Sequence, residues 1–404
     1  MTYDINGLAF LPIRSNDDFS RRLVGHFGIG DADKLVLNRK YSNGEYCPNV
    51  TNILDSNKEP RLEGRIACIT YSYTQSGISN TEAFARILLL SDAAYRNGAE
   101  DVILVMAEHL FDRQDLDPSL RYKSEFRNLP ENIQRKAIAM DGQPYSLETL
   151  VSHFKHAGIS RVLTLDRHSV DCDRIYERIY GRDSREVLFN LESVPVFAHY
   201  IRGLPIDFGE RGKKLVLVAP DENAWATVEV FRDLNGLNDS SVVYCKKSRE
   251  VPNDPGRITT QVDHTTPNYS GVGDKIVIVM DDKADTFGTL RNTLDQSLII
   301  DGKPKQLHAL VTHMLLTTPV AYENIHTYRI NLHGSNSHPN MAFKKDEPGV
   351  ENITVIDFTP YFVWALINHV VPRIPLDKDQ VQDLGKIGEL YSVIKKGKSV
   401  NFVS

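Results

Sequence analysis

The chain has 404 residues, of which 41% are hydrophobic and 25% charged, and its formal net charge is −6. This length predicts about two to three domains, and the acidic balance argues against a nucleic-acid-binding protein, whose phosphate contacts need a basic face. The four cysteines are too widely spaced for a zinc motif or a disulfide framework, so we expect a reduced, cytoplasmic protein. The amino terminus lacks a secretory signal pattern, and no apolar run approaches the ~20 residues that cross a membrane, so we expect no membrane partner.

In the first part of the chain, short runs rich in β-branched and aromatic residues alternate with segments of helical periodicity. Strands are predicted within 34–54 (two, joined by a turn at Asn43-Gly44) and at 65–71, 101–106 and 160–165, with helices at 81–94 and 147–157. This order is typical of a parallel sheet with crossover helices. Residues 116–143 are predicted to be a long polar excursion, and 171–201 to be charged and helical.

A second series of similar order follows. Strands are predicted at 214–219, 241–245, 275–280, 307–312 and 353–357, with helices at 224–234 and 320–325 and a mostly helical tail from Tyr361. A basic loop at 246–249 and a flexible loop at 250–273 separate two of these strands. The layout predicts an α/β fold with one domain at 1–195, a second at 196–370, and a helical tail at 371–404 that packs back on the first domain.

The most informative stretch is the strand ending at Met280, which is followed by Asp281, Asp282 and a loop of small residues leading into a helix. Ligands of open α/β sheets bind beyond the carboxyl ends of strands, and a small-residue loop entering a helix presents backbone N–H groups to a phosphate. The paired carboxylates suit sugar hydroxyls or a metal ion. The stretch therefore predicts a site for a phosphorylated sugar, with the loop residues Asp285, Thr286, Phe287, Gly288 and Thr289 around the phosphate.

Two further groups of residues point to a polyphosphate and a metal ion. Asp166 and His168 follow the strand at 160–165 and are a plausible half-site for a divalent metal or a phosphate, although a lone histidine is more often structural. Lys247 and Arg249 lie in the basic loop, and they could close over a polyphosphate and stabilise charge on a transferring phosphoryl group. A solvated basic turn is the alternative.

Taken in order over residues 34–370, these motifs resemble those of the ribose-phosphate pyrophosphokinases, also called phosphoribosyl pyrophosphate synthetases. The resemblance implies two type I phosphoribosyltransferase-like domains, each a mainly parallel sheet flanked by helices. It implies ATP contacts by Asn43, Glu45, Arg113, Gln114, Asp115 and His168, metal contacts by His168 and Asp221, sugar-phosphate contacts by Asp221, Asp281, Asp282 and residues 285–289, and catalysis by Lys247 and Arg249. The implied reaction moves the β,γ-diphosphate of MgATP onto the anomeric hydroxyl of a 5-phosphorylated ribose.

Departures from the family pattern concern the acceptor. Asn223, Ala224 and Trp225 stand where the family has two glycines, and Phe287 occupies a variable position of the phosphate loop, so we expect Trp225 and Phe287 to decide the acceptor. The candidates are ribose 5-phosphate and ADP-ribose, the latter as in phage-type ADP-ribose pyrophosphate synthetases that feed NAD salvage. A non-catalytic regulatory homologue and a phosphoribosyltransferase are the other hypotheses. The resemblance also implies a homo-oligomer, a dimer or a multiple of dimers.

Overall fold

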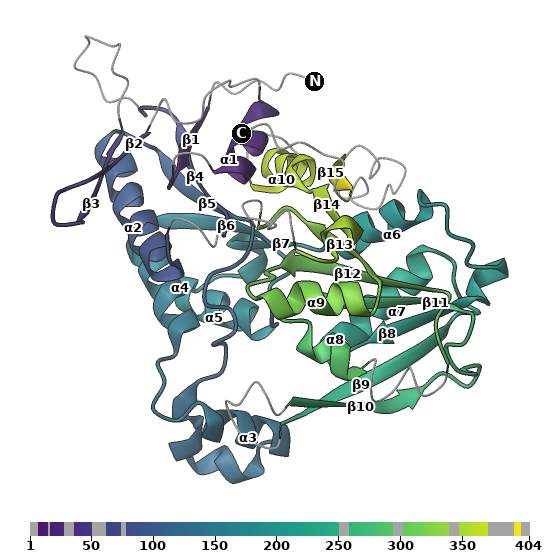
Figure 1. Cartoon of the computed structure of the whole chain (residues 1–404). Helices are drawn as coiled ribbons and strands as arrows, with labels where there is room; N and C mark the ends of the chain where they lie inside the picture. Colours follow the sequence, from purple (N-terminus) through teal and green to yellow (C-terminus); the bar gives the residue numbers. More distant parts are fainter. Residues whose placement is uncertain are drawn as a thin grey trace.

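In the computed structural model, most of the chain forms two α/β units, each a sheet with its helices, that lie side by side (Figure 1). The described residues are 7–14, 17–27, 36–50, 62–73, 78–249, 258–293, 302–338, 347–370 and 392–396. Within these ranges the description excludes the side chains of residues 132, 247–249, 258–259, 289–290, 293 and 392–396.

The first sheet is fully parallel, with the strand order β1-β4-β5-β6-β7. Its strands are β1 (Leu8–Pro12), β4 (Ile66–Tyr71), β5 (Asp101–Met106), β6 (Ile159–Leu165) and β7 (Leu188–Leu191), and its helices are α1 (Asp18–Gly25), α2 (Asn80–Arg96), α4 (Ser146–His156) and α5 (Asp171–Tyr180). A separate antiparallel hairpin is formed by β2 (Val36–Lys40) and β3 (Tyr46–Val50). Every residue of β4 is buried, as expected of a parallel strand covered on both faces.

The second sheet has the order β10-β9-β8-β11-β12-β13-β14-β15, parallel from β9 to β14 and antiparallel at its two edges. Its strands are β8 (Leu215–Ala219), β9 (Ser241–Arg249), β10 (Ile258–Thr265), β11 (Ile276–Ala284), β12 (Gln306–Met314), β13 (Ile330–Ser335), β14 (Ile353–Asp357) and β15 (Ser392–Lys396). The associated helices are α6 (Val194–Arg202), α7 (Ala224–Leu234), α8 (Gly288–Thr293), α9 (Pro319–Thr327) and α10 (Thr359–Ala365), the last continuing as a π-helical turn, Leu366–Val370.

One apolar cluster joins the two sheets. It contains Leu165 of β6, Phe197 of α6 and Met280 of β11, so side chains from both sheets pack in the same core. The rings of Phe19 on α1 and Phe362 on α10 also meet edge to face, with centroids 5.0 Å apart. Because this interface is continuous and apolar, it favours a fixed relation between the sheets over free domain motion.

The predicted α/β class and its central parallel strands are confirmed, whereas several peripheral predictions are wrong. Residues 246–249 belong to β9 and not to a loop, and 258–265, within the predicted flexible loop, form β10. The predicted helical stretch 171–201 contains β7. The strands β1 and β13 were not predicted. In β13 the buried polar residues His333 and Ser335 hide the apolar pattern, since both form hydrogen bonds within the fold.

Two further segments differ from expectation. Residues 116–143 form short 3₁₀ helices (Pro118–Tyr122, Ser124–Asn128) and α3 (Glu131–Ala139), around a small core of Leu116, Ala137 and Met140. The described part of the tail beyond 370 is strand β15, which pairs with β14 of the second sheet, so this part is neither helical nor on the first domain. It is α10, just before the tail, that packs on α1.

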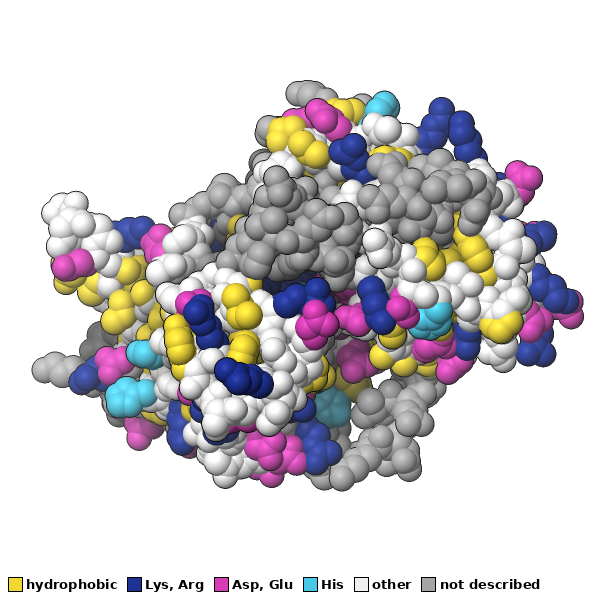
Figure 2. All heavy atoms as spheres, turned by 90° about the horizontal axis from the view of Figure 1, so that it is seen from below, with side chains coloured by type: hydrophobic (Ala, Val, Ile, Leu, Met, Phe, Trp, Pro, Cys, Tyr) yellow, Lys and Arg dark blue, Asp and Glu magenta, His cyan; other side chains and the backbone are white. Residues whose placement is uncertain are grey.

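The face that carries α3, β9 and β10 has a mixed surface. Seen from this side (Figure 2), Lys and Arg side chains alternate with Asp and Glu, and hydrophobic side chains occur only in small groups. Among the described residues, no helix is both long enough and apolar enough to span a bilayer.

Candidate active site between the two sheets

The site begins at the carboxyl end of β11. Residues Ile276 to Met280 are buried, and the strand then continues into Asp281 and Asp282, which are partly exposed. Successive side chains of a strand point to opposite faces, so the two carboxylates reach different neighbours. The side chain of Asp281 also accepts the backbone N–H of Asp282 at 3.0 Å. This predicted pair therefore lies where β11 leaves the sheet.

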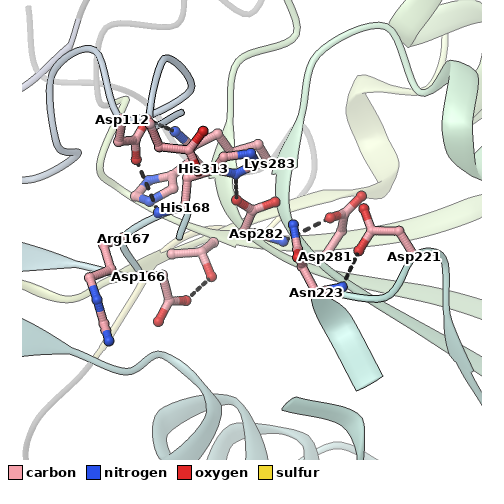
Figure 3. A network of polar contacts seen from close by, with 12 residues as sticks. Asp112, Asp166, Arg167, His168, Asp221, Asn223, Asp281, Asp282, Lys283 and His313 are labelled. Atoms are coloured by element: carbon pink, nitrogen blue, oxygen red, sulfur yellow. Dashed lines mark hydrogen bonds and ion pairs between the residues drawn. The ribbon is translucent and has the colours of Figure 1, made fainter. Parts of the chain in front are cut away.

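His168 reaches this pair from the first sheet. Its Nδ1 lies 2.7 Å from Oδ2 of Asp282 (Figure 3). Burial alone would raise the pKa of Asp282, but the hydrogen bond and charge of His168 outweigh burial and lower the pKa below its usual range. An ionised carboxylate only accepts hydrogen bonds, so Nδ1 is the donor in this contact, and Nε2 is not part of it. The predicted metal and sugar residues are thus brought into direct contact.

Asp221 completes the group of predicted carboxylates. It follows β8, and its Oδ1 accepts the backbone N–H groups of Asn223 and Ala224 at 3.0 and 3.2 Å, at the beginning of α7. Figure 3 shows its carboxylate beside that of Asp281. A cavity of about 220 Å³ adjoins these residues, and its lining comes from both sheets, including Asp166, His168, Asp221, Asp281, Asp282 and Thr312.

These residues fit a hard divalent cation such as magnesium. The carboxylate of Asp221 offers the kind of oxygen ligand that Mg²⁺ prefers. A metal-binding histidine normally donates its other ring N–H to a carboxylate, and His168 does so to Asp282. The ring nitrogen left for a metal is therefore Nε2.

A buried cluster beside the site was not predicted. The ammonium of Lys283 lies 2.7 Å from Oδ1 of Asp112 and 2.9 Å from Oε1 of Glu108, two residues that follow β5. Burial alone would lower the pKa of Lys283, but the carboxylates of Glu108 and Asp112 raise it above the usual value. A lysine directly after two aspartates on a buried strand is the signal that could have indicated this cluster, since a buried ammonium needs a partner.

The cluster also contains a group with the composition of a metal site, formed by Glu108, His313 and His338. Glu108 already forms an ion pair with Lys283, and it accepts a 2.6 Å hydrogen bond from Nε2 of His338. Both ring nitrogens of His313 are engaged, one by the Leu165 carbonyl at 3.1 Å and the other by the Ser337 hydroxyl at 2.9 Å. A cation there would face the ammonium of Lys283, so an ion-pair cluster fits these contacts better than a metal site.

The predicted phosphate loop is shaped by its own side chains. The Asp285 carboxylate accepts the backbone N–H of Thr317 at 3.3 Å, and the Thr286 hydroxyl accepts the N–H of Gly288 at 3.3 Å. Phe287 has a φ of 59° and is only 4% exposed, packed in the core of the second sheet. The ring therefore anchors the loop in the apolar core, and the expectation that this side chain decides the acceptor stays a prediction. The side chain of Thr289 lies outside the described part.

Trp225 is also occupied elsewhere. Its Nε1 donates to the Cys245 carbonyl at 3.0 Å, and its ring meets His264 edge to face with centroids 5.3 Å apart. Trp225 thus packs on the β9–β10 ribbon, while its neighbours Ala226 and Thr227 line the cavity. A helix turns neighbouring side chains to different faces, so Trp225 lies beside the lining residues of α7, and its expected effect on the acceptor stays a prediction.

The predicted ATP residues are only partly assembled. Asp115 is buried and paired with Lys136 of α3 at 2.7 Å, whereas Arg113 is exposed. Asn43 and Glu45 lie at the exposed tip of the β2–β3 hairpin, where the Asn43 side chain accepts the Glu45 N–H at 3.2 Å. Figure 1 shows this hairpin on the far side of the first sheet from β11, so one chain does not bring its tip to the carboxylates.

The predicted catalytic pair lies on β9. Lys247 and Arg249 are paired with Thr260 and Ile258 of β10, and their side chains lie outside the described part. Their backbones belong to a two-stranded ribbon at the edge of the second sheet. The ribbon begins next to β8, the strand that Asp221 follows.

The fold and the site together define a class of α/β proteins in which two mainly parallel sheets lie side by side with acidic residues between them. No protein-family model matches the chain. It is 25% identical over 288 residues to a ribose-phosphate pyrophosphokinase of Cereibacter sphaeroides, covering 70% of both chains. It is 23% identical over 365 residues to that of Halalkalibacterium halodurans, covering 90% of this chain and 95% of the other.

A solved structure agrees with these sequence matches. The crystal structure of phosphoribosylpyrophosphate synthetase from Mycobacterium smegmatis superimposes with a TM-score of 0.65 at 17% identity, covering 89% of this chain and 99% of that one. The chain is thus similar, at low sequence identity, to ribose-phosphate pyrophosphokinases, and the resemblance expected from its motifs is confirmed.

Proposed function

We propose that the protein is an ATP-dependent diphosphokinase that transfers the β,γ-diphosphate of MgATP to the anomeric 1-hydroxyl of a 5-phosphorylated ribose. With ribose 5-phosphate the products are phosphoribosyl pyrophosphate and AMP. The observation that carries the proposal is the 2.7 Å contact between His168 and Asp282, which joins the proposed metal residue to a proposed sugar residue across the two sheets. The ribose-phosphate pyrophosphokinase relatives support the same reaction.

The proposed roles follow from the positions of the residues. Asp281 and Asp282 hold the ring hydroxyls of the sugar, and the backbone N–H groups of residues 286–289 hold its 5-phosphate. His168 and Asp221 would hold magnesium, which neutralises charge on the triphosphate when bound. Arg113 and Gln114 would contact ATP.

The transfer forms one bond to phosphorus and breaks one. The 1-hydroxyl oxygen forms a bond to the β-phosphorus, the bond from that phosphorus to the α–β bridging oxygen breaks, and AMP leaves with the bridging oxygen. The hydroxyl proton is released. Lys247 and Arg249 would stabilise the negative charge that develops on the transferring group.

ADP-ribose is the second candidate acceptor, and the geometry of the phosphate loop favours its consideration. Thr286 is exposed, and a Cβ built on Gly288 would meet only the Thr286 hydroxyl within 4 Å among the described residues. Because Phe287 packs inward, the loop is open on its outer side in the described part. The ADP part attached to the 5-phosphoryl group could extend out of the site on this open side. The product would then be ADP-ribose pyrophosphate for NAD salvage.

The hairpin position supports a homo-oligomer, a dimer or a multiple of dimers. Asn43 and Glu45 are exposed on the side of the first sheet away from β11, so they would contact ATP only in the site of another copy. Light scattering of the purified protein tests this assembly, and a monomer at assay concentration would contradict it.

The acceptor panel is the direct test of the function. The protein is incubated with MgATP and ribose 5-phosphate, ADP-ribose or unphosphorylated ribose, AMP is quantified, and the product is identified by mass. We expect AMP and a product heavier by one diphosphate with a 5-phosphorylated acceptor, and neither with ribose or with excess EDTA. AMP with ADP-ribose alone would select the second candidate. The absence of transfer to every acceptor would contradict the proposed function and favour a non-catalytic homologue.

A further inference from the structure

Lys283 is the buried cation that connects the acceptor strand to the opposite sheet. Its side chain is 4% exposed, and its ammonium lies 2.7 Å from Asp112 and 2.9 Å from Glu108. Lys283 belongs to β11 of the second sheet, whereas both carboxylates follow β5 of the first. It directly follows Asp282, and Asp112 directly precedes Arg113. The ion pair thus joins the two segments that are proposed to hold the two substrates.

The contacts around this ion pair form a closed ring. Oδ1 of Asp112 accepts from Lys283, and its Oδ2 accepts the backbone N–H of His168 at 3.2 Å. The ring of His168 donates to Asp282, which is bonded to Lys283 through the chain (Figure 3). Each of the four residues (Lys283, Asp112, His168 and Asp282) is therefore held by two of the others, so that a shift of one displaces its neighbours.

Stability alone does not explain a lysine at this position. Buried ion pairs are weak evidence for stability, because the cost of removing both charges from water offsets much of their attraction. An apolar side chain with neutral partners would stabilise the same interface about as well. The geometry of an ion pair differs in that it fixes the distance between charged partners and so the register of the two segments.

We infer that Lys283 is a positioning residue that sets the alignment of residues 113–115, the segment proposed to contact ATP, against the proposed acceptor carboxylates Asp281 and Asp282. The inference rests on the proposed diphosphate transfer. In such a reaction the 1-hydroxyl and the β-phosphorus must be held in line, and a displacement of about 1 Å can cost about 100-fold in rate. Lys283 acts through Asp112 and His168 and contacts neither substrate.

The test separates positioning from stability. Lys283→Met alone leaves two buried carboxylates without their cation and is expected to lower the melting temperature. The triple variant Lys283→Met, Glu108→Gln and Asp112→Asn removes all three charges, while the new amides can still accept from His338 and from the His168 backbone. We expect the triple variant to melt near the unmodified protein, yet to lose about 10- to 100-fold in kcat with KM for each substrate changed by less than about threefold.

The control is Arg161→Met, which removes another ion pair between sheet strands. Arg161 lies 3.2 Å from Asp101, near the amino-terminal ends of β6 and β5 and away from the site, so kcat should stay within about twofold of the unmodified value. A triple variant that melts normally and keeps its full kcat would overturn the positioning role. If the unmodified protein itself releases no AMP, the proposed function is overturned, and the role of Lys283 with it.

Discussion

The hydroxyl of Thr312 donates a 2.5 Å hydrogen bond to the carboxylate of Asp166, and this contact links the end of β12 to the end of β6. The same carboxylate accepts the N–H of Ser193 at 3.0 Å and its hydroxyl at 2.5 Å. Asp166 also has a φ of 39°, an uncommon conformation for a residue other than glycine. One side chain on a strained turn therefore satisfies three donors from both sides of the sheet interface.

We predict that Asp166→Ala destabilises the fold by about 2–4 kcal/mol, because it leaves several buried donors without an acceptor. Thr312→Val should cost about 1–2 kcal/mol, since it removes only one hydrogen bond. Thr312→Ser keeps the hydroxyl and is the matched control. Urea unfolding measures the three free energies, and an Asp166→Ala variant as stable as Thr312→Ser would contradict the role of this turn.

His308 should make the protein less stable in mild acid. Its side chain is buried on β12, with Nδ1 3.1 Å from Nε2 of His333, and burial lowers its pKa to about 4. The unfolded chain takes up a proton near the ordinary histidine pKa of about 6.5, whereas the folded chain resists it until about pH 4. The stability contributed by His308 is therefore fully present above about pH 6.5 and is lost as the pH falls to about 4.

Unfolding by urea at a series of pH values between about 7 and 4 measures this effect. We expect a decline attributable to His308 of at most about 3 kcal/mol, and a clearly shallower decline in His308→Gln. His156, exposed at the end of α4, supplies the control His156→Gln, which should follow the unmodified protein. Parallel pH profiles of all three proteins would show that His308 does not contribute.

Lys247 and Arg249 should matter for catalysis and not for folding. We expect Lys247→Ala and Arg249→Ala each to lower kcat by about 100- to 1,000-fold, as is typical when a charge-stabilising donor is removed. Lys246→Ala is the matched control on the same strand. Lys246 pairs with Asp263 at 2.7 Å on the exposed ribbon, and the loss of an exposed pair costs little. An active Lys247→Ala variant would refute the catalytic assignment.

The difference between what was predicted and what was missed has a physical pattern. The stretch from Met280 to Thr289 was recognisable because strand, carboxylates and loop are consecutive in the chain. The partners of Lys283 lie more than 170 residues earlier and meet it only when β5 and β11 align. A local pattern carries no signal for such a contact. Sequence spacing also does not indicate which face of a helix or loop turns inward. The packing of Trp225 on the β9–β10 ribbon and of Phe287 in the core could therefore not be predicted.

Phe287 offers a last test, because its side chain anchors the phosphate loop in the apolar core. Phe287 is 4% exposed and belongs to the same apolar cluster as Met314 and Leu316, so Phe287→Ala should cost about 3–5 kcal/mol and Phe287→Leu much less. Neither substitution introduces a glycine, so both variants keep the same penalty for the left-handed φ of 59° at this position. If the ring only anchors the loop, Phe287→Leu should keep its preference among ribose 5-phosphate and ADP-ribose, with a modestly higher KM for both. A reversed preference in Phe287→Leu, measured as the ratio of the two kcat/KM values, would show that Phe287 decides the acceptor.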